Sequence, residues 1–146
     1  MKEKILSLDP TADLADIFSY VKSRFHWCVR NKILTPEVID SNRELFADNG
    51  ILHNQNGENA HILVTGKMLV TGRNSYIRAT QSAKVIAIDS HVRAFDDTVV
   101  KTTGNSTVKA HDDSVVHGND GTIIFLYDNA ILKGYCYNVY DYRKTI

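Results

Sequence analysis

From about residue 60 onward, small, apolar and polar residues recur at an interval of eight. The segment STVKAHDDSVVHGNDG, residues 106–121, shows this clearly, because STVKAHDD nearly superimposes on SVVHGNDG. One central apolar residue anchors each unit, and nearly every step between anchors is eight residues, with two steps of seven. So regular an interval indicates a repeat architecture. The anchors are Ile62, Leu69, Ile77, Val85, Val92, Val100, Val108, Val116, Ile124, Leu132 and Tyr140.

The alternation of side chains within each unit predicts one short strand and one corner. Ser, Thr or Ala usually stands two residues before the anchor and a small residue often stands two after it, so one narrow face points inward. Pairs such as Asp112-Asp113 and Asp120-Gly121 follow. They are typical of tight corners, because their side chains bond the local backbone and tolerate positive φ. Sixteen residues therefore form one coil of two strands.

Stacked coils of this kind predict a mainly β protein, a two-sheet parallel β-solenoid with about 16 residues per coil and a thin core. The anchors give about five and a half coils, roughly 26 Å long at a strand spacing of ~4.8 Å. Leu126, Tyr140 and Tyr142 are larger than most residues at equivalent positions, and we expect them to close the last coil. A β-sandwich of short antiparallel strands is the alternative, which the regular spacing disfavours.

The first fifty residues follow a helical period instead. Asp9-Pro10 and Thr35-Pro36 each pair an N-cap residue with a proline at the first helical position, and Asn49-Gly50 is suited to ending a helix. We therefore expect an α-helical cap or appendage over residues 1–59 and a β-solenoid of octad repeats over residues 60–146. Apolar residues spaced three and four apart form one face of the first helix: Leu14, Ile17, Phe18, Val21, Phe25 and Cys28.

The units HVRAFDDT, STVKAHDD and IFLYDNAILKG resemble those of octapeptide-repeat β-solenoid proteins, a group of uncharacterised phage, prophage and gut-bacterial type. The resemblance covers about residues 62–142 and implies architecture only, since these proteins share no known activity. A phage-encoded chain of this kind would be a reasonable inhibitor of a host or defence complex, acting by steric occlusion.

Alternate units belong to alternate sheets, so outward-facing residues can be assigned to each. The sheet that contains Ile77, Val92, Val108 and Ile124, here sheet one, carries a column of like charges, Arg78, Arg93 and Lys109, between aromatic residues. Such columns repel. Their residue types suit a protein interface or a single-stranded nucleic-acid surface, although a solvated face without a partner also fits. The candidate partner-binding residues are Tyr76, Arg78, His91, Arg93, Phe95, Lys109, Phe125 and Tyr127.

The other sheet, here sheet two, carries an outward aliphatic strip that includes Val99, Val115 and Ile131. An exposed apolar strip of this length is unusual. Three occupants fit it: the N-terminal helices folded back over part of the sheet, a second copy of the chain in a homodimer, or a foreign partner. Trp27 poses a similar choice, because it lies beside the apolar face of the first helix. It either contacts the cap or stays exposed as an anchor for a partner.

Composition narrows the class of protein. Hydrophobic residues make up 43% and charged residues 23% of the chain, and the formal net charge is zero, so a folded protein is expected rather than a uniformly basic one. No apolar run reaches the roughly 18 residues that a membrane span needs. MKEKILSLDP lacks the apolar segment of a signal peptide, so we expect a cytoplasmic location. Cys28 and Cys136 lack CxxC spacing and are expected to be reduced.

No motif predicts catalysis, a metal or a cofactor. The six histidines form no HxH or HxxxH pair, and GxSxG and phosphate-loop motifs are missing. The corner aspartates Asp96, Asp112 and Asp128 lack the glycine-rich spacing of calcium-binding β-rolls. We therefore expect a non-enzymatic protein that binds another macromolecule, foremost a protein. Nucleic-acid binding through the basic and aromatic face of sheet one is the alternative, and self-assembly into a structural protein is the second alternative.

Overall fold

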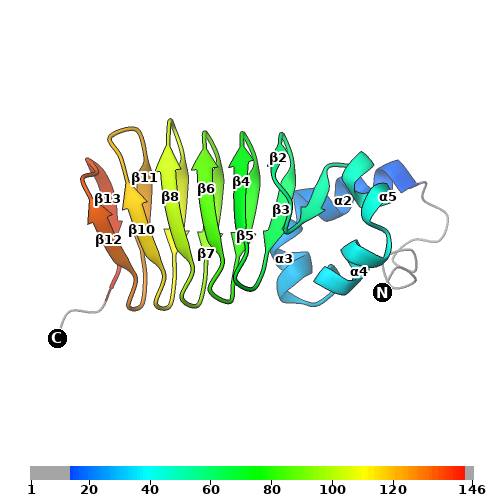
Figure 1. The fold of residues 1–146 in the computed structure, drawn as a ribbon, viewed down its shortest axis with the longest axis horizontal. Helices are drawn as coiled ribbons and strands as arrows, with labels where there is room; N and C mark the ends of the chain where they lie inside the picture. The colour runs from blue at the N-terminus through cyan, green and yellow to red at the C-terminus, as the bar shows by residue number, and fades with distance from the viewer. Residues whose placement is uncertain (1–13, 144–146) are drawn as a thin grey trace.

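The computed structural model describes residues 14–143, and Figure 1 shows them as a stack of coils with short helices at one end. The strands wind into a β-solenoid of about six turns with about 15 residues per turn. All neighbouring strands are parallel and belong to two sheets. The predicted fold class, a mainly β two-sheet parallel solenoid, is therefore confirmed.

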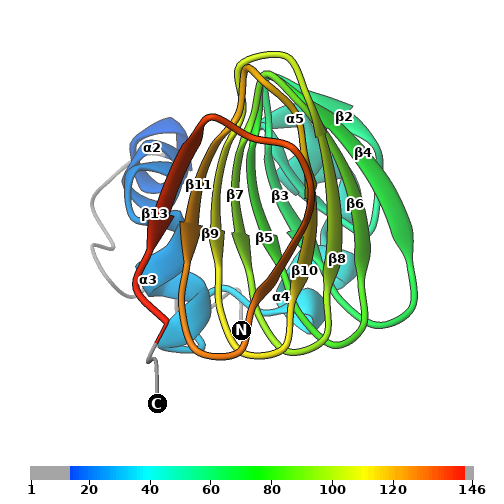
Figure 2. The ribbon, with the colours of Figure 1, turned by 90° about the vertical axis from the view of Figure 1, so that its left-hand side faces the viewer.

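The two sheets take alternate strands along the chain. Sheet one contains β1 (Ile51–His53), β3 (His61–Val64), β5 (Tyr76–Ala79), β7 (His91–Ala94), β9 (Thr107–Ala110), β11 (Ile123–Leu126) and β13 (Asn138–Asp141). Sheet two contains β2 (Gly57–Glu58), β4 (Leu69–Arg73), β6 (Lys84–Ile88), β8 (Val99–Thr103), β10 (Val115–Gly118) and β12 (Ile131–Gly134). Figure 2 looks along the stack and shows the two sheets facing each other across the core.

A thin core of apolar and small residues fills the coil, as the repeat predicts. The inward anchors, such as Ile77 and Val108, are fully buried. The small position two residues before the anchor forms a buried serine row. The N–H of Ser75 donates to Ser90 Oγ, and the N–H of Ser90 donates to Ser106 Oγ, each over 3.1 Å. These hydroxyls satisfy backbone donors that would otherwise be buried without a partner.

The corner aspartates Asp96, Asp112 and Asp128 form a second row, here the corner carboxylate row. All three have positive φ, from 55° to 57°, which Asp adopts more readily than most residues. Each Oδ2 accepts a backbone N–H from the preceding coil: Gln81 donates to Asp96 over 3.0 Å, Asp96 to Asp112 over 2.9 Å, and Asp112 to Asp128 over 3.0 Å. Hydrogen bonds from backbone N–H groups therefore explain why aspartates stand at these corners.

Two anchors predicted from the sequence are displaced by one residue. Val70 pairs with the buried Val85 and is itself buried, whereas Leu69 is 59% exposed. Val139 pairs with Ile124 and packs on the core, whereas Tyr140 and Tyr142 are exposed. The prediction that these tyrosines close the last coil is therefore wrong. Leu126, by contrast, is buried.

The two predicted helices are each divided in two. The first becomes α2 (Leu14–Ser23) and α3 (Phe25–Arg30), and the second becomes α4 (Pro36–Ser41) and α5 (Arg43–Asp48). The predicted start at Asp9-Pro10 lies outside the described residues. The start at Thr35 is confirmed, because its Oγ1 accepts the N–H of Val38 over 3.2 Å. Gly50, directly after the C-cap Asn49, has a φ of +78°, which suits the end of a helix.

The helices pack on the first strands of sheet one. Their core includes Phe18 and Phe46, whose rings meet edge to face with centroids 5.0 Å apart, and it extends to Ile51 of β1 and Leu63 of β3. No residue of sheet two belongs to this core. Of the three occupants considered for the aliphatic strip of sheet two, the described helices α2 to α5 are excluded, because their apolar faces pack on β1 and β3.

A buried histidine ties the cap to the first coils. His53 of β1 is 7% exposed, and its Nδ1 lies 2.9 Å from Asp40 Oδ1 of α4. Its Nε2 lies 2.8 Å from Thr65 Oγ1, just after β3. Because the three groups come from a helix, a strand and a turn, the contacts hold the cap in a fixed orientation. Among the described residues, no helix is long and apolar enough to cross a membrane.

Candidate functional site

A cleft of about 670 Å³ lies between α3 and the outer face of sheet one. Figure 2 shows α2 and α3 beside the outer side of this sheet, so the helices form one wall and the strands the other. The lining residues come from Lys22 to Arg30 and from β3, β5, β7 and β9: Lys22, Ser23, Arg24, Phe25, His26, Trp27, Arg30, His61, Tyr76, Arg78, His91, Val92, Arg93, Thr107 and Lys109.

The charge of this lining has one sign. Six of the residues are Lys or Arg, and none is Asp or Glu. Ion pairs within the described part of the chain lie elsewhere, at Asp40, Asp128 and Asp141. The cleft cations therefore share a concave surface without a neutralising carboxylate, an arrangement that focuses a positive potential.

The predicted column of like charges forms the floor of the cleft. Arg78 pairs in register with Arg93, and Arg93 pairs with Lys109. Arg78 is only 9% exposed and its guanidinium carbon lies 4.3 Å from the ring centroid of Phe95. Its Nη1 lies 3.5 Å from His26 Nδ1, while its Nε has no hydrogen-bond partner among the described residues. Burial, together with Arg93 and Arg30, lowers the pKa of Arg78 to about 10.

Two of the histidines that line the cleft, His26 and His61, have pKa values well below the usual value of a histidine. Burial, reinforced by Arg93 and Arg78, lowers the pKa of His26 to about 3. Burial and the nearby Lys22 lower the pKa of His61 to about 4. His26 and His61 therefore add little to the positive charge of the six Lys and Arg side chains, and an anion in the cleft would favour protonation of His26.

The aromatic residues of sheet one stack on one another. His61, Tyr76 and His91 form one row with ring centroids 4.9 and 5.1 Å apart, here the first ring row. The second ring row contains Phe95, His111, Tyr127 and Tyr142, with centroids 4.6 to 5.3 Å apart. Most ring faces are therefore already covered. The sequence-based hypothesis of an open stacking platform must be narrowed to the ends of these rows and to Trp27, which is 43% exposed.

All eight candidate residues lie on the outer side of sheet one, in the strands expected for them or directly after these strands. Five of them, Tyr76, Arg78, His91, Arg93 and Lys109, line the cleft. Phe95, Phe125 and Tyr127 do not line it. Phe95 instead lies under Arg78, Tyr127 belongs to the second ring row, and Phe125 stacks on Tyr140 with centroids 5.0 Å apart.

The helical wall of the cleft was not predicted from the sequence. The segment KSRFHWCVR, residues 22–30, contains Lys22, Arg24, Arg30, His26 and Trp27 without a single acidic residue. This basic and aromatic composition is a signal that could have been found. It was hidden because residues 22–30 lie outside the repeat and their position relative to sheet one depends on how the cap packs.

The other surfaces considered from the sequence carry weaker features. No group of three or more His, Cys, Asp or Glu side chains within residues 14–143 is placed to hold a metal ion. In sheet two, Leu69, Lys84, Val99, Val115 and Ile131 form one outward column in register, and Ile131 is 48% exposed. Whether this strip pairs two copies of the chain stays a prediction.

No family model matches the sequence, and neither the curated proteins nor the solved structures contain a match to it.

Proposed function

We propose that this protein is non-enzymatic and binds single-stranded nucleic acid in the cleft between α3 and sheet one. The observation that carries the proposal concerns the described residues: six Lys and Arg side chains line the cleft without a carboxylate, and the buried Arg78 among them has an Nε without a hydrogen-bond partner. Guanidinium groups bind phosphate oxygens through paired hydrogen bonds, and a phosphate would offset the repulsion within the column.

The dimensions of the cleft favour a single strand over a duplex. A volume of about 670 Å³ lies in the range of sites that hold a small molecule or a short chain segment. A B-form duplex, whose major groove alone is about 12 Å wide, is too broad to enter such a cleft. Trp27 at the helical wall offers an exposed ring on which a base can stack.

The direct test is fluorescence anisotropy of a labelled single-stranded oligonucleotide, titrated with the protein at about 50 and 200 mM salt. Each phosphate contact contributes about 0.7 to the salt slope for a single strand, so four contacts predict a roughly 50-fold loss of affinity over this range. A labelled duplex should bind more weakly at both salt concentrations. Equal binding of strand and duplex would contradict recognition inside the cleft.

A pair of double variants locates the binding surface. We expect Arg78→Glu with Arg93→Glu to abolish binding, because two cations of the floor become anions. The matched control is Lys84→Glu with Lys101→Glu, the same charge change on the exposed outer face of sheet two. Circular dichroism checks that both variants keep the fold. Loss of binding in the control to the same extent would show that net charge, and not the cleft, governs affinity.

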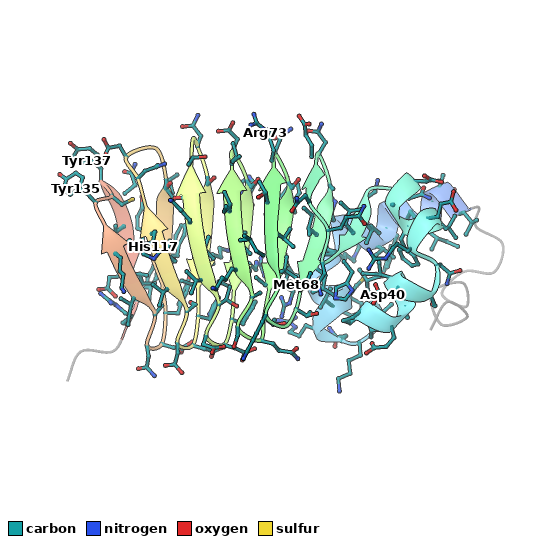
Figure 3. The ribbon with its side chains drawn as sticks, in the orientation of Figure 1. Asp40, Met68, Arg73, His117, Tyr135 and Tyr137 are labelled. Carbon is teal, nitrogen blue, oxygen red and sulfur yellow. The ribbon has the colours of Figure 1, made fainter. Side chains whose placement is uncertain are left out.

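Capture of a protein partner is a second candidate function, supported by exposed aromatic residues at the end of the solenoid remote from the helices. Figure 3 shows Tyr135 and Tyr137 projecting there, and both are more than 60% exposed. Tyrosines dominate many protein interfaces. Together with the resemblance to phage octad-repeat solenoids, this supports an inhibitor that acts in the cytoplasm by occluding a host or defence complex.

Nuclease treatment distinguishes the two candidates. A protein that stays bound to the immobilised chain after nuclease digestion, and is lost with Tyr135→Ser and Tyr137→Ser, would support the second function. Proteins that are released by nuclease, and are not captured by the Arg78→Glu and Arg93→Glu variant, would instead indicate bridging by nucleic acid.

A further inference from the structure

We propose that the gap over Thr107, where the first ring row ends, is a slot in which one nucleobase of the bound strand stacks against His91. The slot deepens the proposed function and depends on it, since it assigns a stacking position on sheet one in addition to the exposed ring of Trp27 on the helical wall.

The register of sheet one creates the gap. Tyr76 pairs with His91, His91 with Thr107, and Thr107 with Ile123, so these four side chains occupy one outward column. Rings fill this column at His61, Tyr76 and His91 at intervals of 4.9 and 5.1 Å. At Thr107 the column has no ring, so the ring face of His91 directed toward β9 has no aromatic neighbour within residues 14–143.

The gap has the size of one planar ring. His91 and Ile123 are two strand spacings apart, about 9.6 Å. A ring placed midway lies about 4.8 Å from each neighbour, which matches the spacing within the row and the usual separation of offset-stacked rings. One base therefore continues the row with His91 on one side and the aliphatic side chain of Ile123 on the other.

The polar groups around the gap suit a nucleotide. Arg93 and Lys109 stand in the adjacent column, on the same strands as His91 and Thr107, and all four residues line the cleft. Phosphates on either side of a base in the slot therefore lie beside cations. The Thr107 hydroxyl makes no hydrogen bond to another described residue, so it is free to bond the edge of the base.

The second ring row offers no equivalent position in the cleft. Its first ring, Phe95, is covered by the Arg78 guanidinium on one side and by His111 on the other. Its last ring, Tyr142, lies in the final coil and does not line the cleft. The end of the first ring row at His91 is therefore the place where an uncovered ring face meets the phosphate-binding cations.

The test compares two labelled oligonucleotides of equal length and charge, one of deoxyadenosines and one in which the central residues are abasic. Stacking of one base typically contributes about 1–3 kcal/mol, or roughly 5- to 150-fold in affinity, so we expect the adenine strand to bind about tenfold more tightly. Replacing one adenine by 2-aminopurine adds a direct signal, because its fluorescence is quenched by the neighbouring adenines in the free strand and changes when the base leaves them for the slot.

Thr107→Tyr fills the slot with a ring of the protein itself. We expect this variant to bind both strands with the affinity of the abasic strand, and the change in 2-aminopurine fluorescence on binding to be lost. Thr107→His fills the slot with a smaller ring and should behave alike, which guards against misfolding of one variant. Thr103→Tyr makes the same change on the outer face of sheet two and should keep the tenfold preference.

The possible outcomes separate the two proposals. If the wild-type protein binds adenine and abasic strands equally, the slot is refuted while the phosphate-binding cleft stands. If folded Thr107→Tyr and Thr107→His proteins keep the preference, the base stacks elsewhere and the slot is also refuted. If neither strand binds the wild-type protein, the proposed function fails and the slot fails with it.

Discussion

The two outer faces of the solenoid are built by the same repeat and differ in how they distribute charge. On sheet one, Arg78, Arg93 and Lys109 are direct neighbours in one column. On sheet two, the column of Thr71, Ile86, Lys101, His117 and Lys133 separates each cation from the next by an uncharged residue or a histidine. A helical wall faces the column of sheet one only.

This difference shows which features of the chain the fold requires. The inward positions must be apolar or small, because they fill the core, whereas the outward positions tolerate many residues. On sheet two, an uncharged residue or a histidine separates each cation from the next, so the column adds little electrostatic repulsion. Sheet one instead places three like charges at strand spacing, which is unfavourable without a counter-charge. The fold does not require the like-charged column of sheet one, so this column is a better indicator of function than the column of sheet two.

The largest expected effect comes from moving the column to the other face. In the Arg78→Glu and Arg93→Glu background, Ile86→Arg with His117→Arg places four cations in consecutive register, the two new arginines with Lys101 and Lys133. Because no helix within residues 14–143 lines a cleft over this column, we expect it to bind an oligonucleotide at least about 50-fold more weakly than the wild-type cleft at 200 mM salt. Anisotropy measures the difference. Full recovery of affinity would show that the column alone is sufficient.

The second expectation is a gain in stability at the expense of binding. Arg78→Met keeps a long unbranched side chain, removes the Nε that has no partner, and relieves repulsion with Arg93. We expect the free energy of unfolding to rise by about 1 kcal/mol, as when other buried charges are replaced by apolar residues, and affinity for the oligonucleotide to fall about tenfold. Denaturant titration and anisotropy measure the two quantities. Lys84→Met on sheet two should change neither.

The third expectation concerns pH. The pKa of His26 is about 3 in the folded protein and 6.5 in the unfolded chain, so the unfolded chain binds more protons between these values. Stability is therefore lost as pH falls from 6.5 toward 3, by at most about 1.4 kcal/mol per pH unit for each such histidine. Denaturant titrations at pH 7 and pH 5, above the range of the carboxyl groups, should show a smaller loss for His26→Gln. An identical loss would indicate that His26 titrates normally.

The smallest expected effect tests the first ring row. Tyr76 stacks on both His61 and His91, and such ring pairs contribute about 0.5–1.5 kcal/mol each beyond their buried area. Tyr76→Ser should therefore lower the free energy of unfolding by about 1–2 kcal/mol. Leu69→Ser removes an exposed side chain on sheet two and should cost less than about 0.5 kcal/mol. Equal effects would show that stacking on sheet one adds nothing to stability.

The sequence was sufficient to predict the coil, the alternation of sheets and the register of the basic column. The reason is that Val, Ser and Asp recur where the core, the small inward row and the corners need them. It failed at Leu69 and Tyr140, where two apolar residues are adjacent and periodicity alone does not decide which one points inward. Tyr140 is exposed because the register of the last coil places Val139, and not Tyr140, opposite Ile124.

Only the sheet-one side of the cleft could be predicted from the sequence. Arg78, Arg93 and Lys109 stand in a repeat, so their mutual position follows from the period. Arg24 at the N-cap of α3, and Trp27 and Arg30 within α3, have positions that are set by tertiary packing. The contacts of the cap core with Ile51 and Leu63, and those of His53, determine this packing. Such contacts leave no periodic trace, and for this reason a concave site between the two regions was not expected from the sequence.

The corner carboxylate row gives the solenoid a direction of assembly. Each aspartate accepts an N–H from the coil before it, so a coil is completed only when the next one has formed. The helices meanwhile cover the first strands, which are also the first that a ribosome releases. We therefore expect folding during synthesis to proceed from the helices outward, with the corner aspartates of each new coil accepting hydrogen bonds from the previous one. Shortening the chain from its C-terminus would remove these corner hydrogen bonds one coil at a time. The coils nearest the helices, which line the cleft, would be the last to be affected.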